Sequence, residues 1–218
     1  MKGTVFMNSL EYILNKFNIK DYSKTVMPIE IPNYGRANLA ELFKELGFKV
    51  GVEIGTERGL YAQVLCEANP GVHLFCIDPW IAYKGYYDHT WQEKISKSYE
   101  IAKQTLEPYN CTIIRKFSMD AIKDFKDNSL DFVYIDGNHR FEFVVDDFSW
   151  EKKVRPGGII SGHDFVRFNH QRNCHVTEAV TGYTLSYLIS PWFLLGTRRR
   201  IRDQIRDRHR SFMWVKKE

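Results

Sequence analysis

Short apolar segments alternate with helical segments along most of this chain, and this alternation limits its fold more than any other feature. Strands are expected at 50–55, 73–78, 111–115, 130–136 and 159–162, and helices at 38–46, 60–68, 91–106, 119–125 and 141–152. Strands that alternate with helices form right-handed crossovers, which place the strands in a largely parallel sheet covered on both faces. The sequence therefore predicts a doubly wound α/β fold.

The alternation ends near the C-terminus. After a helical pattern at 176–188, two apolar runs at 192–195 and 212–215 have no clear crossover helix between them. We expect them to pair as antiparallel strands. No internal repeat or low-complexity linker divides the chain, so we expect residues 1–35 to form an N-terminal extension or lid and residues 36–218 to form one domain.

The composition indicates an ordinary globular protein, since 44% of the 218 residues are apolar and 27% are charged. The N-terminus lacks the basic start and apolar run of a targeting signal, and no stretch of about eighteen apolar residues could span a membrane. We therefore expect a cytoplasmic protein with no membrane partner. The four cysteines show no paired close spacing, and we expect free thiols rather than disulfides or a zinc site.

Positive charge is concentrated between Arg198 and Arg210. Seven arginines lie there against two aspartates, a local balance of +5 in a chain of net charge +4, so the remainder carries −1. Such a run could bind the phosphates of a nucleic acid. It could also be a solvated connection, which the lack of interleaved aromatic residues favours. A small molecule is therefore the favoured partner. The alternative is that the chain is a nucleic-acid-binding protein or a nucleic-acid methyltransferase.

The turn after the first predicted long strand indicates which cofactor the sheet could bind. Residues 53–59, EIGTERG, form a glycine-containing strand-to-helix turn, where doubly wound folds bind a nucleotide. The dinucleotide fingerprint requires glycine where Glu57 stands, and a carboxylate there would repel a pyrophosphate. S-adenosylmethionine has no phosphate and carries a sulfonium and an ammonium, so glutamates are tolerated beside it. Asp78 ends the next strand, where an acid can accept hydrogen bonds from the ribose hydroxyls.

Together these segments resemble class I S-adenosylmethionine-dependent methyltransferases, and among them methyltransferase family 24. The likeness covers roughly 50–164 and rests on residues 53–59, 77–78, 118–121, 136–139 with Asp147 downstream, and 156–158 with 163–164. It implies a Rossmann-like sheet of seven strands, mostly parallel with an antiparallel C-terminal strand, and O-methylation of a small molecule or sugar. The expected cofactor-binding residues are Glu53, Gly55, Thr56, Gly59, Asp78, Ser118, Met119 and Asp136.

Two neighbouring strands are expected to deliver acids and histidines to one edge of the sheet. Asp136 and His139 end the strand at 130–136, and His163 and Asp164 follow the strand at 159–162. An imidazole titrates near neutral pH, so His139, with Asp136 beside it, is suited to take the acceptor's proton. Alternatively, Asp136, Asp164 and His163 could hold magnesium or manganese, which would acidify the acceptor hydroxyl. In a third alternative the acids only orient the two histidines.

Aromatic residues crowd into the loop after the strand at 73–78. They are Trp80, Tyr83, Tyr86, Tyr87 and Trp91, with His89 among them. These side chains could stack on an acceptor as a lid, pack the loop onto the sheet or form a homodimer contact. Further along, Asp147 is expected to be a structural acid rather than a catalytic one. A nicotinamide enzyme, or a cofactor binder without activity, is a further alternative for the whole chain.

Overall fold

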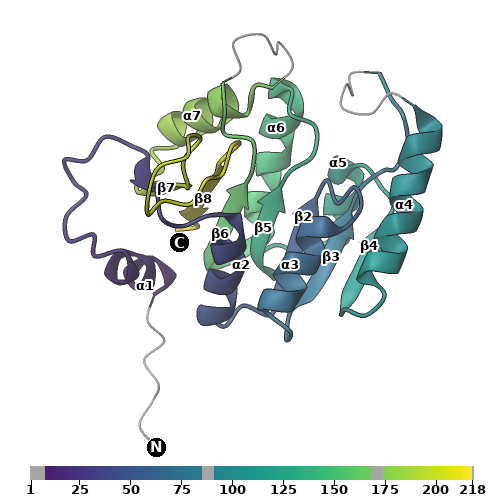
Figure 1. Ribbon diagram of the computed structural model, residues 1–218, viewed down its shortest axis with the longest axis horizontal. Coiled ribbons are helices and arrows are strands. Elements are labelled where there is room, and N and C mark those ends of the chain that lie inside the picture. The colour runs from purple at the N-terminus through teal and green to yellow at the C-terminus, as the bar shows by residue number, and fades with distance from the viewer. Residues whose placement is uncertain (1–7, 85–90, 168–173, 218) are drawn as a thin grey trace, which may run out of the picture.

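The computed structural model describes residues 8–84, 91–167 and 174–217, and an eight-stranded sheet forms its centre (Figure 1). The strands are β1 (Ile29–Ile31), β2 (Val50–Ile54), β3 (His73–Ile77), β4 (Cys111–Ile114), β5 (Leu130–Ile135), β6 (Val154–Gly162), β7 (Trp192–Leu195) and β8 (Ser211–Val215). Their order is β1-β7-β8-β6-β5-β2-β3-β4. β8 runs antiparallel to β6 and β7, and the other neighbouring pairs are parallel. The predicted, mostly parallel fold with an antiparallel C-terminal strand is confirmed.

The prediction of seven strands is wrong by one. β1 lies within residues 1–35 and pairs in parallel with β7 at the edge of the sheet, with Ile29 opposite Phe193. The helix α1 (Ser9–Lys16) lies in the same segment, and its Ile13 is fully buried. A strand of three residues is too short to show an alternating pattern, which is why the sequence did not indicate it. The lid role of this segment stays a prediction.

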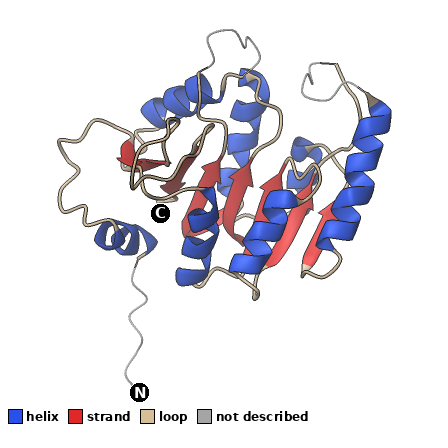
Figure 2. Ribbon diagram, in the orientation of Figure 1, coloured by secondary structure: helices blue, strands red, loops and turns tan. Residues whose placement is uncertain are grey.

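Helices cover both faces of the sheet (Figure 2). α1, α2 (Arg36–Glu45) and α3 (Leu60–Ala68) pack on one face, together with the end of α4 (Gln92–Leu106). α5 (Ser118–Ala121), α6 (Phe141–Asp147) and α7 (Val176–Ser186) pack on the other. Successive β5 side chains alternate between the two cores, Phe132 and Tyr134 in the first and Val133 and Ile135 in the second. This period of two is the geometry of a strand buried on both faces.

Some predicted boundaries differ from the structure. The pattern at 141–152 is α6 followed by the 3₁₀ helix η2 (Phe148–Lys152), and the pattern at 119–125 is α5 followed by η1 (Ile122–Asp124). The strand predicted at 159–162 already begins at Val154, and its register with β5 shifts near the left-handed Gly157. Within the described ranges, no helix is both long and apolar enough to cross a membrane.

Four parallel strands end at the same level of the sheet. Ile54 of β2 is in register with Ile77 of β3 and Ile135 of β5, and Ile135 is in register with Gly162 of β6. The residues that come next therefore leave the sheet side by side at its carboxyl edge: Gly55, Asp78, Asp136 and His163. β2 and β5 meet where the strand order reverses, and ligands of doubly wound folds bind outside that switch point.

The aromatic stack around Phe132 is predicted to contribute strongly to stability. Its ring lies 4.1 Å from that of Phe43, centroid to centroid, and fills the space over Gly51, where a Cβ would overlap it. Phe132→Ala should lower the free energy of unfolding in urea by about 3–5 kcal/mol. Phe141→Ala, at a position that is 48% exposed, should lower it by less than about 1 kcal/mol. Equal losses in the two variants would contradict this account of the core.

Candidate active site

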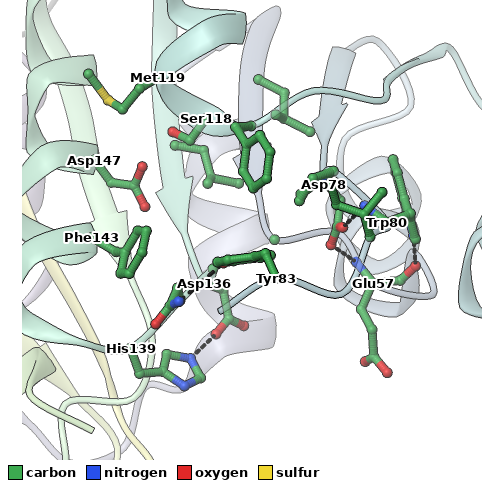
Figure 3. A pocket seen from close by; sticks show the side chains of 18 of the residues that line it. Glu57, Asp78, Trp80, Tyr83, Ser118, Met119, Asp136, His139, Phe143 and Asp147 are labelled. Atoms are coloured by element: carbon green, nitrogen blue, oxygen red, sulfur yellow. Dashed lines mark hydrogen bonds and ion pairs between the residues drawn. The ribbon is translucent and has the colours of Figure 1, made fainter. Parts of the chain in front are cut away.

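A cavity of about 450 Å³ opens at the carboxyl ends of β2, β3 and β5 (Figure 3). Its walls come from the loops after these three strands and from α4, α5 and α6. Five of the residues predicted to bind the cofactor line it: Gly55, Asp78, Ser118, Met119 and Asp136. The predicted base His139 lines it as well. The shared register of the strands thus brings most of the predicted site into one space.

Three other predicted cofactor residues lie behind the cavity wall. Glu53 and Thr56 are buried, with 2% and 4% of their surface exposed. Burial raises the pKa of Glu53 to about 8, so its carboxyl group is largely neutral at pH 7. Gly59 precedes α3 with a φ of 76°, and a Cβ there would press on Leu106 of α4. These residues support the turn, and none of them belongs to the cavity lining.

Asp78 is held in position by backbone groups of two loops. One carboxylate oxygen accepts a hydrogen bond from the backbone N–H of Glu57 (3.0 Å), and the other accepts one from that of Trp80 (2.8 Å). The Trp80 indole N–H donates to the Glu57 carbonyl oxygen (2.8 Å), which ties the two loops together. Glu57 has a φ of 49°, the glycine-like conformation, and its carboxylate extends away from Asp78 (Figure 3). The Glu57 backbone therefore follows the tight turn although the residue is not glycine, and its N–H supports Asp78.

Apolar surface and a second acid lie across the cavity from Asp78 (Figure 3). Phe117 and Met119 are each 37% exposed within this lining, so their apolar surfaces are open to a ligand. Asp147 lines the cavity with 5% of its surface exposed, and its expected role as a structural acid stays a prediction. Burial raises the pKa of Asp147 to about 7, against the opposing effect of the Ser118 hydroxyl. Near neutral pH this carboxyl group can therefore donate as well as accept a hydrogen bond.

Tyr83 connects the aromatic loop with the end of β5. Its hydroxyl oxygen accepts a hydrogen bond from the Asn138 side-chain amide (3.1 Å), and its ring meets that of Phe117 edge-on at 5.2 Å. Trp80 is 1% exposed and Trp91 is 70% exposed. The other residues of the predicted lid, Tyr86, Tyr87 and His89, lie outside the described residues. A lid or dimer role for this loop stays a prediction.

Asp136 and His139 belong to a cluster of acids and imidazoles that extends from the cavity to the end of β6. His139 Nε2 lies 3.5 Å from Asp136 Oδ1 and 3.3 Å from Asp164 Oδ2. His163 Nδ1 lies 3.1 Å from Asp164 Oδ2, and His209 Nδ1 lies 2.6 Å from Asp164 Oδ1. Asp164 thus contacts three imidazoles. His163 and Asp164 do not line the cavity but lie behind Asp136 and His139.

The carboxylates and imidazoles of this cluster stabilise each other's charged forms. Burial alone would raise the pKa of Asp164, but the hydrogen bond from His163 and the charges of the neighbouring histidines lower it. Burial alone would lower the pKa of His163, but Asp164 and Asp207 raise it to about 9. His163 is therefore an imidazolium near neutral pH and is paired with carboxylates.

Three members of the surroundings were not predicted from the sequence. Arg36, at the start of α2, places Nη1 3.4 Å from Asp136 Oδ2. Asp207 Oδ1 lies 3.3 Å from His163 Nε2, and His209 bonds to Asp164. Asp207 and His209 lie in the irregular connection between β7 and β8. The sequence does contain one signal for Asp207 and His209, since they interrupt the arginine run with an acid and an imidazole.

Two sets of donor atoms in the cluster could hold a cation. Asp136, His139 and Asp164 form one set, and His163, Asp164 and His209 form the other; the donor atoms of each lie within 4.8 Å of one another. The predicted metal set of Asp136, His163 and Asp164 is divided between these two, with His163 Nδ1 3.9 Å from Asp136 Oδ2. Mixed carboxylate and imidazole donors fit manganese or iron better than magnesium.

The fold of this chain is a Rossmann-like methyltransferase fold. The O-methyltransferase from Bacillus cereus, solved in complex with SAH, matches with a TM-score of 0.58 over 96% of this chain and 91% of its own, at 19% identity. The family model of the methyltransferase domain matches residues 52–165. Because this match spans more than half of the chain, the chain belongs to that family, methyltransferase family 24.

Two relatives match part of the chain. Protein y4gI of Sinorhizobium fredii is 27% identical over 120 residues, which are 52% of this chain and 13% of y4gI. Protein R132 of Acanthamoeba polyphaga mimivirus is 29% identical over 133 residues, which are 59% of this chain and 56% of R132. The chain therefore spans about half of R132 and a small part of y4gI.

The buried Glu53 predicts a pH dependence of stability. Its folded pKa of about 8 lies above its ordinary value of 4.5, so the folded state resists ionisation while the unfolded state ionises as the pH rises through this window. Stability contributed by the neutral carboxyl group is present below pH 4.5 and is lost towards pH 8. When the pH rises from 5 to 8, the free energy of unfolding in urea should fall by about 3 kcal/mol less in Glu53→Gln than in the wild type. The exposed control Glu93→Gln should follow the wild type, and a Glu53→Gln profile parallel to the wild type would be evidence against the buried neutral acid.

Proposed function

We propose that this protein is an S-adenosylmethionine-dependent methyltransferase that methylates a hydroxyl group of a small molecule. The observation that carries the proposal is the cavity itself, which has Asp78 at one end and the Asp136–His139 pair at another. Membership of a methyltransferase family supports the reaction class. The O-methyltransferase fold of the Bacillus cereus protein is consistent with an oxygen acceptor.

The charge of the cavity supports a cationic cofactor. Five acids are among its lining residues, Glu57, Asp78, Asp136, Asp146 and Asp147, whereas none of the described lining residues is a lysine or arginine. Although Asp147 is only partly ionised near pH 7, the other four acids leave this wall negative, so it attracts a sulfonium and an ammonium and repels a pyrophosphate. This favours S-adenosylmethionine over a nicotinamide dinucleotide. The open apolar surfaces of Phe117 and Met119 could cover an adenine ring, and Asp78 could accept the ribose hydroxyls.

The cluster beside the cavity could handle the acceptor's proton. S-adenosylmethionine would supply the methyl group, which an acceptor oxygen attacks in line with the bond to sulfur. In our proposal His139 takes the proton from that oxygen. Its Nε2 lies 3.5 Å and 3.3 Å from carboxylate oxygens of Asp136 and Asp164, and two negative charges favour the imidazolium that forms. Asp164, itself held by His163 and His209, would act as a positioning residue.

A divalent cation is a second candidate for the same task. The convergence of donor atoms from Asp136, His139 and Asp164 favours it. A bound manganese or iron ion would lower the proton affinity of an acceptor hydroxyl. Chelation separates the two alternatives. A methyl-transfer rate that is unchanged after removal of metals would leave His139 as the base, whereas a rate lost on chelation and restored by manganese would assign the task to the cation.

Binding of S-adenosylhomocysteine, measured by isothermal titration calorimetry, tests the cofactor assignment. Asp78→Ala should weaken binding by about 10-fold to 100-fold, because hydrogen bonds to a charged group contribute about 1.5–3 kcal/mol. The matched control is Asp127→Ala, an exposed acid paired with Lys153 before β5. Its affinity should equal that of the wild type. No heat with the wild type, or equal binding by Asp78→Ala, would count against the assignment.

The role of His139 predicts a separation of binding from chemistry. With methyl-labelled S-adenosylmethionine and an extract of small metabolites, His139→Gln should transfer label about 100-fold more slowly than the wild type. Its affinity for S-adenosylhomocysteine should be unchanged. The control is His73→Gln, a histidine on β3 bonded to Thr112. Full transfer activity in His139→Gln would rule out the imidazole as the base.

A further inference from the structure

The connection between β7 and β8 carries positive charge that the proposed reaction does not use. We name residues 197–210 the arginine loop. It contains seven arginines against Asp203 and Asp207, a balance of +5 in a chain of net charge +4, so the remainder of the chain carries −1. The net positive charge of this protein therefore comes from one loop.

The arginine loop is closed at its base and has a fixed position on the fold. The backbone N–H of Thr197 donates to the Ile205 carbonyl oxygen, and that of Asp207 donates to the Thr197 carbonyl oxygen, both at 2.9 Å. The backbone N–H of Ile205 donates to the Pro32 carbonyl oxygen at 3.0 Å. These bonds fix the loop against the segment before α2, and residues 198–204 form its tip.

Two side chains attach the arginine loop to the acid–imidazole cluster. His209 bonds to Asp164 (2.6 Å), and Asp207 lies 3.3 Å from His163. β7 ends, and β8 begins, at the same edge of the sheet as the cavity, since Phe212 of β8 is in register with Gly162. The loop therefore lies beside the cluster that we propose to handle the acceptor's proton, and far from the loop after β3, across the strand order.

Most of the loop's positive charge is available to a ligand. Arg202 pairs with Asp203, and Arg210 pairs with Glu30. The other five are exposed and form no ion pair with any residue of the described chain: Arg198, Arg199, Arg200, Arg206 and Arg208. Uncompensated guanidinium groups on one fixed loop repel one another, and a multiply charged anion would relieve that repulsion.

We propose that the arginine loop binds a phosphate group of the methyl acceptor, so that the substrate is a phosphate-bearing small molecule. This inference rests on the proposed function and names its substrate class. The planar guanidinium group donates two parallel hydrogen bonds to phosphate oxygens, which fixes orientation as well as charge. Because the base of the loop contacts the acid–imidazole cluster through Asp207 and His209, a phosphate on the loop would hold the acceptor beside that cluster.

A small anion fits this arrangement better than a nucleic acid does. A polyanion needs basic surface along an extended track, whereas the chain outside the loop has a net charge of −1. The neighbouring cluster pairs the carboxylates of Asp136, Asp164 and Asp207 with imidazoles, so it adds no further basic surface beyond the loop. The basic surface is therefore matched to one phosphate or pyrophosphate group.

Calorimetric titration of the full chain with pyrophosphate at an ionic strength of about 0.1 M, where the Debye length is about 10 Å, tests the proposal. The triple variant Arg198→Gln, Arg199→Gln, Arg200→Gln should bind pyrophosphate at least about tenfold more weakly than the wild type. The matched control removes three exposed lysines from the opposite edge: Lys44→Gln, Lys126→Gln, Lys152→Gln. It should bind within about twofold of the wild type, since charges further apart than a Debye length are screened.

Three results would overturn the proposal. They are absence of pyrophosphate binding by the wild type, equal weakening in the two triple variants, and tighter binding of a twenty-nucleotide oligonucleotide than of pyrophosphate that depends on the same three arginines. The last result would identify a nucleic-acid surface instead. S-adenosylhomocysteine is titrated separately into each protein. Its failure to bind the wild type would reject the proposed function while leaving the pyrophosphate result to be judged by itself.

Discussion

The hydrogen-bonded register of β2, β3, β5 and β6 is the constraint on which the site depends. Because these strands end at one level, Gly55, Asp78, Asp136 and His163 leave the sheet together. Glycine makes this close alignment feasible at two strand ends, since a Cβ at Gly55 would overlap the Asp136 backbone and one at Gly162 would overlap the Ile135 carbonyl oxygen. A shift of one residue in any pair would turn an acid away from the edge.

Charge is divided along this edge in a way that suits a transfer between ligands of opposite sign. The cavity over β2, β3 and β5 is lined by acids, and the arginine loop beyond β6 is basic. The acid–imidazole cluster lies between them and contains both signs, with Asp164 in contact with His139, His163 and His209. In the proposed arrangement a cationic donor and an anionic acceptor meet at the group that takes the proton.

The sequence predicted the parts of the site that follow regular strands. Periodicity located β2, β3 and β5, and their ends gave Gly55, Asp78 and Asp136 in the cavity. It could not place residues whose position depends on irregular backbone. Asp147 lines the cavity from the last residue of α6, and His209 reaches Asp164 from a loop 45 residues further along the chain. Neither position can be predicted from the periodicity of the sequence. The three residues of β1 are likewise too few to show an alternating pattern.

A crystal structure of this chain with S-adenosylhomocysteine would test the proposed cofactor site directly. We expect the ligand to occupy the cavity with its ribose hydroxyls on the Asp78 carboxylate. Its adenine should lie against Phe117 and Met119, and its sulfur should face Asp136 and His139. A ligand bound outside this cavity, or a ribose directed away from Asp78, would rule out the proposed cofactor site.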